Sequence, residues 1–245
     1  MKLCVLGSGS SGNALLLEAE DGLFLVDCGL LWRDLKARAE RAGFSLHGLR
    51  YVFITHEHAD HVRGLESLVR RGVKVVASPG TLQALEVKGI PAEKGLEILG
   101  CKLFPFPLPH DAREPMGLRI EWDSVKVGIV TDLGKVTPAI LSELAGCETL
   151  VLESNHDLGM LLSGPYPWPL KLRILGPFGH LANEEAAQAL KNLRDWAKTV
   201  FLAHLSQENN TPQLALETVA RALNGWEGHL FLTYPDRPSA VISGG

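Results

Sequence analysis

The sequence has only four cysteines in 245 residues, and none of them belongs to a CxxC pair. Cys4, Cys28, Cys101 and Cys147 are far apart along the chain, so their pattern indicates neither a disulfide framework nor a cysteine-based zinc site. The first apolar run is not preceded by the charged, apolar and small-residue segments of a leader peptide. From these absences we expect a reduced, cytoplasmic protein.

Long apolar runs and an excess of one charge are also missing. No run approaches the ~20 residues that a membrane helix requires, so a membrane partner is not expected. The chain has 24 Lys and Arg against 28 Asp and Glu, a formal net charge of -4. A broad basic face of the kind that wraps long nucleic acid is therefore not indicated, and a small or locally gripped substrate is favoured.

What the sequence does have is enough apolar material for a large core. Apolar residues make up 46% of the chain, which favours one globular domain spanning residues 1–245. Apolar runs bounded by turn residues predict strands at 1–7, 14–20, 23–29, 51–55, 73–77, 117–122, 126–132, 149–154, 199–204 and 230–234. Helical spacing of apolar residues predicts helices at 33–42, 61–71, 78–85, 138–145, 183–196 and 211–223.

The predicted elements alternate after the first three strands, which is typical of an α/β fold with sheets inside and helices outside. Val62, Leu65, Leu68 and Val69 fall on one face of the predicted helix 61–71. The proline-rich segment 163–180 interrupts the alternation. Because it keeps several large apolar residues, we interpret it as an ordered loop.

The segment ITHEHADHVRGL, residues 54–65, concentrates ligand-type side chains directly after an apolar strand: His56, His58, Asp60 and His61. Neutral imidazoles and ionised carboxylates are metal donors, and a mixed set without thiolates is typical of a catalytic centre that keeps a position open for water. The alternative is a chance cluster of surface histidines. The density of the motif argues against chance.

So short a segment cannot complete two metal sites, and three further candidates stand at the ends of other apolar runs. His110 follows FPFPLP, Asp132 ends KVGIVT, and His204 ends TVFLA. Strand ends at one edge of a sheet converge in space even when they are distant in sequence. Each of the three, taken alone, is as well explained as a packed or solvated residue.

Together these residues resemble the ligand motifs of the metallo-β-lactamase fold superfamily, and the resemblance covers essentially the whole chain. It implies a four-layer αββα sandwich made of two similar halves. It also implies that His56, His58 and His110 hold one metal, that Asp60, His61 and His204 hold the second, and that Asp132 bridges them. Asp27, in LFLVDCG, matches the first motif of the superfamily and would orient ligands rather than bind metal.

Two divalent ions can lower the pKa of a bridging water, provide hydroxide at neutral pH and neutralise the charge of a displacement. We expect both ions to be zinc. Manganese and iron are the alternatives, because all three metals accept histidine and carboxylate ligands. The superfamily includes β-lactam, thioester and phosphodiester hydrolases. The ligand motifs therefore do not name the substrate.

Other segments resemble the YycJ (WalJ) branch of bacterial metallo-β-lactamase fold proteins: GSGSSGN at 7–13, ESNHD at 153–157 and the run 166–183. GHLANEEAA also resembles the histidine motif of ribonuclease Z, in which a glutamate partners the histidine. His180 and Glu153 match that pair, which implies that His180 is a general acid supported by Glu153. The expected catalytic residues are therefore His180, Glu153 and the metal ligand Asp60. The alternatives are a helix-capping histidine and an ordinary strand-end carboxylate.

Anion contacts are predicted at two further places. The glycines of residues 7–12 would let backbone N–H groups and Ser8 or Ser10 face a phosphate, although a simple hairpin turn explains the segment equally well. Lys171 and Arg173 in PLKLR would add positive charge. Two solvated cations on a strand are the alternative for that pair.

The sequence thus predicts a dinuclear metal-dependent hydrolase, and a phosphodiesterase in particular. Its substrate would be nucleic acid ends, DNA or RNA, or a small phosphodiester, with exonuclease action as one form. Phosphodiesters expel a poor leaving group, for which an acid such as His180 is useful. A thioester or lactone hydrolase, which needs His180 less, and a catalytically idle metal-binding module are the two other hypotheses. The oligomeric state is left open.

Overall fold

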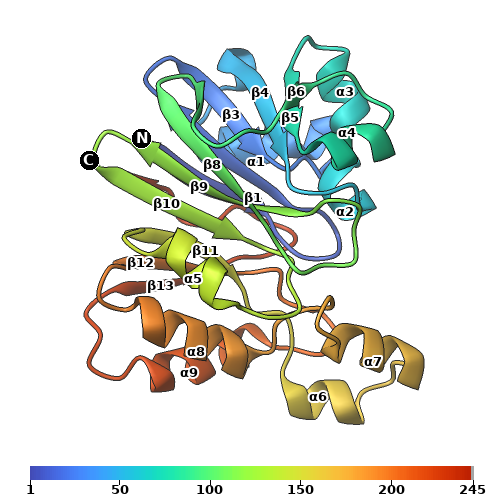
Figure 1. Cartoon of the computed structure of the whole chain (residues 1–245), viewed down its shortest axis with the longest axis vertical. Helices are drawn as coiled ribbons and strands as arrows, with labels where there is room; N and C mark the ends of the chain where they lie inside the picture. Colours follow the sequence, from blue (N-terminus) through green and yellow to red (C-terminus); the bar gives the residue numbers. More distant parts are fainter. Residues whose placement is uncertain (244–245) are drawn as a thin grey trace.

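The protein is two facing β-sheets covered by helices on both outer sides, in a computed structural model that describes residues 1–243 (Figure 1). The first sheet has the order β14-β1-β2-β3-β4-β5-β6. Its strands are β1 (Lys2–Gly7), β2 (Ala14–Ala19), β3 (Gly22–Val26), β4 (Leu49–Ile54), β5 (Lys74–Ala77), β6 (Ile90–Pro91) and β14 (Ile242–Ser243).

The second sheet repeats this plan with the order β13-β12-β11-β10-β9-β8-β7. Its strands are β7 (Leu96–Ile98), β8 (Cys101–Pro107), β9 (Met116–Trp122), β10 (Val125–Val130), β11 (Thr149–Glu153), β12 (Thr199–Ala203) and β13 (His229–Leu232). In each sheet an antiparallel meander continues into parallel strands, β3-β4-β5 in the first and β10-β11-β12 in the second. This repetition agrees with the two similar halves that the resemblance implied.

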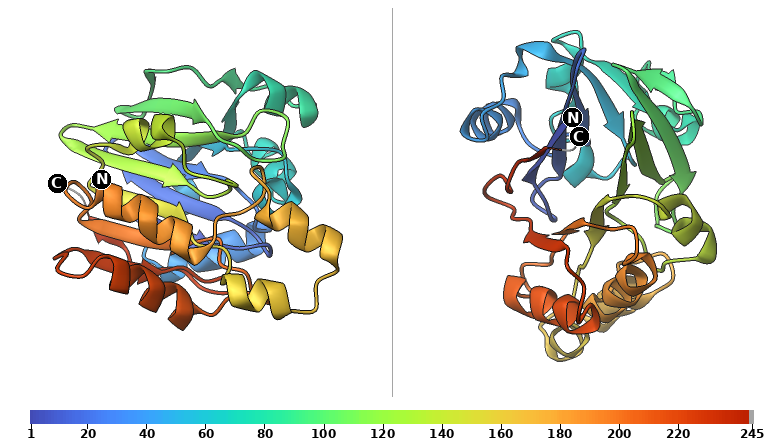
Figure 2. Two further views of the ribbon diagram at one scale, coloured as in Figure 1. Left: turned by 60° about the horizontal axis from the view of Figure 1, so that its bottom comes forward. Right: turned by 90° about the vertical axis from the view of Figure 1, so that its left-hand side faces the viewer.

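Helices occupy the two outer layers (Figure 2). Those of the first half are α1 (Trp32–Arg41), the 3-10 turn η1 (Leu46–Gly48), α2 (Ala59–Val62), α3 (Leu65–Val69) and α4 (Pro79–Ala84). Those of the second half are α5 (Pro138–Leu144), α6 (Leu158–Ser163), α7 (Trp168–Leu175), α8 (Asn183–Leu193) and α9 (Pro212–Ala222). The predicted αββα sandwich is confirmed.

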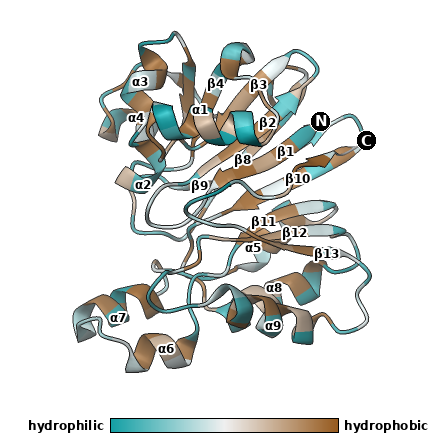
Figure 3. Ribbon diagram, turned by 180° about the vertical axis from the view of Figure 1, so that it is seen from behind, coloured by the Kyte–Doolittle hydropathy of each residue, from teal (hydrophilic) through white to brown (hydrophobic). Residues whose placement is uncertain are grey.

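Three apolar cores fill the three spaces between the layers. The central core lies between the sheets and contains Phe24 and Phe201, while the outer cores lie under α1 and α3 on one side and under α5, α8 and α9 on the other. Successive strand residues point to opposite faces, so β12 sends Phe201 to the central core and Leu202 to the outer one. Burial on both faces explains why these strands are apolar runs without alternation, brown along most of their length in Figure 3.

The predicted helix 61–71 is wrong, because the structure contains two short helices, α2 and α3, in its place. The chain turns at Gly64, whose backbone N–H donates to the carbonyl of Cys28. A Cβ at Gly64 would lie 2.3 Å from the carbonyl oxygen of Leu30, so the close passage requires glycine. The turn also leaves Val69, placed on the apolar face by prediction, 44% exposed.

The segment 163–180 is not the ordered loop that the prolines suggested, since it contains α7. Pro169 stands in the first turn of this helix, where a proline displaces no intrahelical hydrogen bond. Proline content alone therefore misleads here.

All four cysteines are buried free thiols. Among residues 1–243, no helix combines the length and the apolar character that crossing a membrane requires.

Replacing Phe24 by alanine should lower the free energy of unfolding by about 3–5 kcal/mol, because it opens a cavity between the two sheets, where Phe24 is 1% exposed. Urea denaturation measures the change. Val69→Ala, at an exposed position of α3, is the control, and its free energy of unfolding should stay within about 0.5 kcal/mol of the parent value. Similar losses in both variants would contradict the assignment of the central core.

Candidate metal centre

Nine ligand-type side chains meet where strands of both sheets end at one edge of the sandwich. The groups that could share a metal ion are His56, His58 and His110; His56, His61 and Asp132; Asp60, His61 and His204; and Asp132, Glu153, His180 and His204. The structure brings together all seven ligands that the resemblance implied, with Glu153 and His180 beside them. β10, β11 and β12 are neighbouring parallel strands of the second sheet, so Asp132, Glu153 and His204 meet at their C-terminal ends. The C-terminal end of β4, in the first sheet, brings His56 and His58 to the same place.

Three imidazole nitrogens form the first group. His58 Nδ1 lies 3.1 Å from His56 Nε2 and 3.3 Å from His110 Nε2. Donors held about 2.0–2.1 Å from a tetrahedral zinc ion would be roughly 3.3 Å apart. The spacing therefore fits three ligands of one ion.

The second group lies around His61. Asp60 Oδ2 is 3.6 Å from His61 Nε2 and 3.4 Å from His204 Nε2. Asp132 faces both groups, with Oδ2 3.2 Å from His61 Nε2 and Oδ1 3.9 Å from His110 Nε2. Its position between the two groups fits a bridging ligand.

Asp132 provides an independent test of whether a cation fits. Its Oδ2 atom is buried and accepts no hydrogen bond from the described residues. A buried carboxylate oxygen without a donor is costly unless a cation lies beside it. The donor set and this oxygen together fit divalent metal ions.

The local electrostatics also require positive charge at the centre. Burial raises the pKa of Asp132, but the imidazoles of His204 and His61 outweigh it and hold that pKa well below its usual range. Burial lowers the pKa of His204, whereas Asp132 and Asp60 more than offset it and raise the pKa to about 10. These carboxylates therefore favour positive charge at the centre, which divalent metal ions would supply.

Asp27 organises the ligands of the first sheet. It is buried at the end of β3 with a left-handed backbone, φ 60°, and its Oδ2 accepts the Nδ1–H of His61 at 2.8 Å. Its Oδ1 accepts the backbone N–H of Thr55 at 2.9 Å, and the Thr55 hydroxyl in turn accepts from His56 Nδ1 at 3.0 Å. Both histidines are thereby left with Nε2 facing the centre.

Glu153 has the corresponding place in the second sheet. Its Oε1 accepts from His180 Nδ1 at 2.7 Å and from His204 Nδ1 at 3.0 Å. Its Oε2 accepts the backbone N–H groups of Leu133 and Leu181 at 3.0 and 3.2 Å. This fully buried carboxylate thus joins His180 to the metal centre. The sequence had predicted only His180 as its partner, and the structure adds His204.

His180 lies at the border of the cleft, with 17% of its side chain exposed. Burial lowers the pKa of His180, but the Glu153 carboxylate more than compensates and raises it. With Nδ1 bound to Glu153, Nε2 is the ring atom left for the cleft. The cleft itself has a volume of about 310 Å³ and is lined by Ser10, His58, Ala59, Asp60, Asp132, Arg173, His180 and His204.

Of the predicted anion contacts, Ser10 and Arg173 line this cleft, but Ser8 and Lys171 do not. Ser8 is buried, and its hydroxyl accepts the backbone N–H of His204 at 2.8 Å. The Lys171 ammonium is occupied by the carbonyls of Leu162 and Gly164, at 2.6 and 2.8 Å, and joins α6 to α7. Lys171 is on a helix rather than a strand, and neither side chain is available to a phosphate.

Several residues that hold the ligands in place were not predicted to do so. His204 has a left-handed backbone, φ 54°, which Ser8 holds through the N–H and Asn155 holds through the carbonyl, at 2.8 Å. Asn13 lies 3.2 Å from Asp60 Oδ2 and 3.0 Å from His61 Nε2. Thr55 directly precedes His56, and Asn13 is the last residue of GSGSSGN, which was the available signal.

Glu57, between His56 and His58, points away from the centre, and its Oε1 accepts the backbone N–H of Arg113 at 2.7 Å. His110 is oriented by the Gly179 carbonyl, which accepts from Nδ1 at 3.1 Å. The loop before His180 therefore also positions a ligand.

An αββα sandwich with a histidine and carboxylate centre at its strand ends defines a class of metal-dependent hydrolases. A family model described as the Beta-lactamase superfamily domain matches residues 23–205. The chain belongs to this superfamily and is a metal-dependent hydrolase of that fold.

Among curated proteins the chain is similar to exodeoxyribonuclease YycJ of Bacillus anthracis, 36% identical over 89% of this chain and 88% of the relative. It is also similar to exodeoxyribonuclease WalJ of Streptococcus pneumoniae, 35% identical over 91% of this chain and 88% of the relative. A ribonuclease Z of Mycobacterium sp. is 28% identical to this chain over 57% of this chain and 55% of the relative. The resemblance to the YycJ (WalJ) branch is confirmed.

Among solved structures, the metallo-β-lactamase fold protein YhfI of Bacillus subtilis superimposes with a TM-score of 0.77 over 99% of both chains, at 17% identity. This similarity confirms the fold.

Replacing Asp27 by alanine should lower metal affinity about 10- to 100-fold, because His61 and the Thr55–His56 pair lose the carboxylate that orients them. Competition with a chromogenic chelator measures the affinity directly. Asp195→Ala, at an exposed site, is the control. Unchanged metal affinity in Asp27→Ala would refute the orienting role.

Proposed function

We propose that this protein is a dinuclear metal-dependent phosphodiesterase that hydrolyses nucleic acid ends, with exonuclease action on DNA. The observation that carries the proposal is the Glu153–His180 pair, 2.7 Å apart, at the border of a metal cleft. The names of the YycJ and WalJ relatives support DNA as the substrate, and the ribonuclease Z relative supports the wider class of phosphodiesters.

The proposed ligands are His56, His58 and His110 for one ion, Asp60, His61 and His204 for the other, and Asp132 for both. When bound, the two ions would supply an activated water and neutralise charge on the phosphate. Zinc is proposed first, since the donors are imidazoles and carboxylates, with manganese or iron as alternatives. Asp60 belongs to the catalytic set as a ligand.

The residues of the chain would carry out the other steps. Arg173, whose Nε donates to Asp111 at 2.6 Å, would hold the phosphate from the α7 side of the cleft, and Ser10 would face it from the loop after β1. As water attacks phosphorus and the bond to the leaving oxygen breaks, His180 Nε2 would donate its proton to that oxygen. Glu153 would hold the ring and stabilise the proton until transfer.

A donor on the leaving-group side is needed most when the leaving group is an alkoxide. A thiolate or a nitrophenolate departs without strong acid assistance, so a thioester hydrolase would have little use for this pair. The Glu153–His180 geometry therefore favours the phosphodiesterase over the thioester alternative.

His180→Ala should lower kcat on a DNA end about 10²- to 10⁴-fold, because the alkoxide would leave without a proton. Cleavage of bis-p-nitrophenyl phosphate should fall much less, since nitrophenolate is a good leaving group. Steady-state rates of the metal-loaded protein with both substrates provide the measurement.

His229→Ala, at an exposed strand position, is the matched control. Metal content is measured in each variant, because His180 contacts Glu153, which also binds His204. Equal losses on both substrates with full metal content would overturn the acid role. Turnover of S-lactoylglutathione but of no phosphodiester would replace the proposal by thioester hydrolysis, and no turnover of any substrate would favour a binding module.

A further inference from the structure

Arg63 lies at the rim of the metal cleft and has no part in the metal centre. It follows α2, and its backbone N–H donates to the carbonyl of Ala59 at 3.0 Å, so it stands one helical turn after a residue that lines the cleft. Its Nη1 donates to the carbonyl of Ser11 at 2.6 Å, next to Ser10, which also lines the cleft. The contact with Ser11 therefore places the exposed guanidinium of Arg63 next to the cleft lining, of which Arg63 itself is not a part.

The platform under Arg63 is fixed to the metal ligands. The backbone N–H of Asn13 donates to the carbonyl of Asp60 at 2.7 Å, and Gly12 donates to Gly9 at 2.9 Å within the same loop. The loop and α2 therefore move as one unit. A guanidinium anchored on them has a defined position relative to Asp60.

Some neighbouring basic residues pair with carboxylates, whereas Arg63, like Arg38 and Arg71, donates to a neutral carbonyl. Arg70 pairs with Glu66, and Lys36 lies 3.7 Å from Glu40. Within residues 1–243, Arg63 forms no ion pair with a carboxylate, and its hydrogen bond to a neutral carbonyl leaves the charge uncompensated. An exposed arginine in this state can bind an anion through its remaining N–H groups.

Positive charge continues outward from Arg63, although the whole chain has a net charge of -4. Arg71 follows α3, and its guanidinium lies 4.2 Å from the ring centre of Trp32, which begins α1. Helix α1 itself has four basic residues and two acidic ones, and all four basic residues lie outside the metal cleft: Arg33, Lys36, Arg38 and Arg41. The net charge of the chain concealed this local basic surface.

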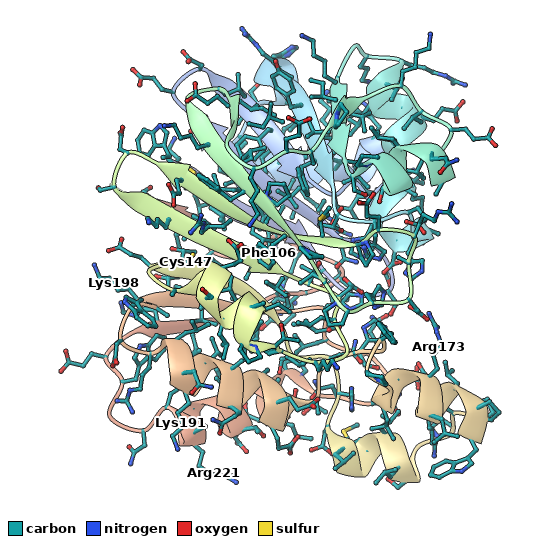
Figure 4. All side chains as sticks on the ribbon, viewed as in Figure 1. Phe106, Cys147, Arg173, Lys191, Lys198 and Arg221 are labelled. Atoms are coloured by element: carbon teal, nitrogen blue, oxygen red, sulfur yellow. The ribbon has the colours of Figure 1, made fainter. Side chains whose placement is uncertain are left out.

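The opposite wall of the cleft has a single arginine, Arg173 on α7. Figure 4 labels it on the side of the molecule where α2 and α7 lie, away from Lys191 on α8 and Arg221 on α9, which belong to the same helical layer as α7. A polyanion that enters between α2 and α7 would meet Arg173 on one side and Arg63 on the other.

We propose that Arg63 binds a backbone phosphate of the nucleic acid strand beyond the scissile linkage and directs the strand from the cleft across α2 and α3. This inference rests on the proposed nuclease function. It identifies Arg63 as a substrate-positioning residue that distinguishes a polynucleotide from a small phosphodiester. Loop anchoring alone would give Arg63 no effect on that choice.

The test compares Arg63→Gln, which keeps a donor for Ser11 but loses the charge, with Arg63→Lys, which keeps the charge. Arg221→Gln is the matched control, an exposed arginine on α9. With metal-loaded protein, Arg63→Gln should raise KM for a DNA oligonucleotide several-fold and leave kcat nearly unchanged. The slope of log KM against log salt should fall in size by roughly 0.7–1, one phosphate contact.

Bis-p-nitrophenyl phosphate has only the scissile phosphate, so its kinetics should be the same in Arg63→Gln and the parent. Arg63→Lys should restore most of the DNA affinity. A neutral methylphosphonate linkage, moved along the oligonucleotide, should abolish the effect of Arg63→Gln at one position beyond the cleaved bond.

Equal losses on both substrates would overturn the proposal in favour of a loop-anchoring role, and an unchanged KM with an unchanged salt slope would also overturn it. If the parent protein cleaves no phosphodiester, the proposed function fails. Fluorescence anisotropy with labelled DNA then tests Arg63 separately: weaker binding by Arg63→Gln than by Arg221→Gln supports the contact, and equal binding overturns it.

Discussion

The structure depends on two buried carboxylates, Asp27 and Glu153, which hold the imidazoles of the metal centre by hydrogen bonds. Each lies at the end of a strand in a different sheet, and each fixes ligands so that the second ring nitrogen points to the same cleft. Glu153 also accepts two backbone N–H groups, from the loops that follow Asp132 and His180. Without these two acceptors, the imidazoles could turn and the donors would no longer meet.

The two halves of the fold serve this requirement in the same way. A meander followed by parallel strands brings C-terminal strand ends to one edge of each sheet, and the central core packs the two edges face to face. Burial then raises the free energy of every unpaired charge in the cleft. Asp132 Oδ2, which is buried and accepts no hydrogen bond from the described residues, is an example. Because buried carboxylate charge is unfavourable without a neighbouring cation, the same burial favours the binding of divalent cations.

Glu153 connects metal binding to the second chemical role of the cleft. One of its oxygens contacts both His204, a proposed ligand, and His180, the proposed acid. The position of the acid is thus set relative to the metals by one shared atom rather than by two separate segments. His180 lies on a loop and Glu153 on β11, and their hydrogen bond holds these two segments together.

The sequence predicted the proposed ligands, because an HxHxDH cluster and three polar residues at the ends of apolar runs stand out. It also predicted an α/β fold from the alternation of strands and helices, whereas the two-sheet sandwich came from the resemblance to the superfamily. Only the tertiary structure decided which polar residues support the site and which face the substrate. Ser8 and Lys171 were predicted as anion contacts but bind backbone groups, and Arg63, which was not predicted as a site residue, contacts the loop that carries Ser10 of the cleft lining. Local sequence specifies residue type, whereas the partner of a serine or a cation depends on distant segments that meet only when the sheets pack.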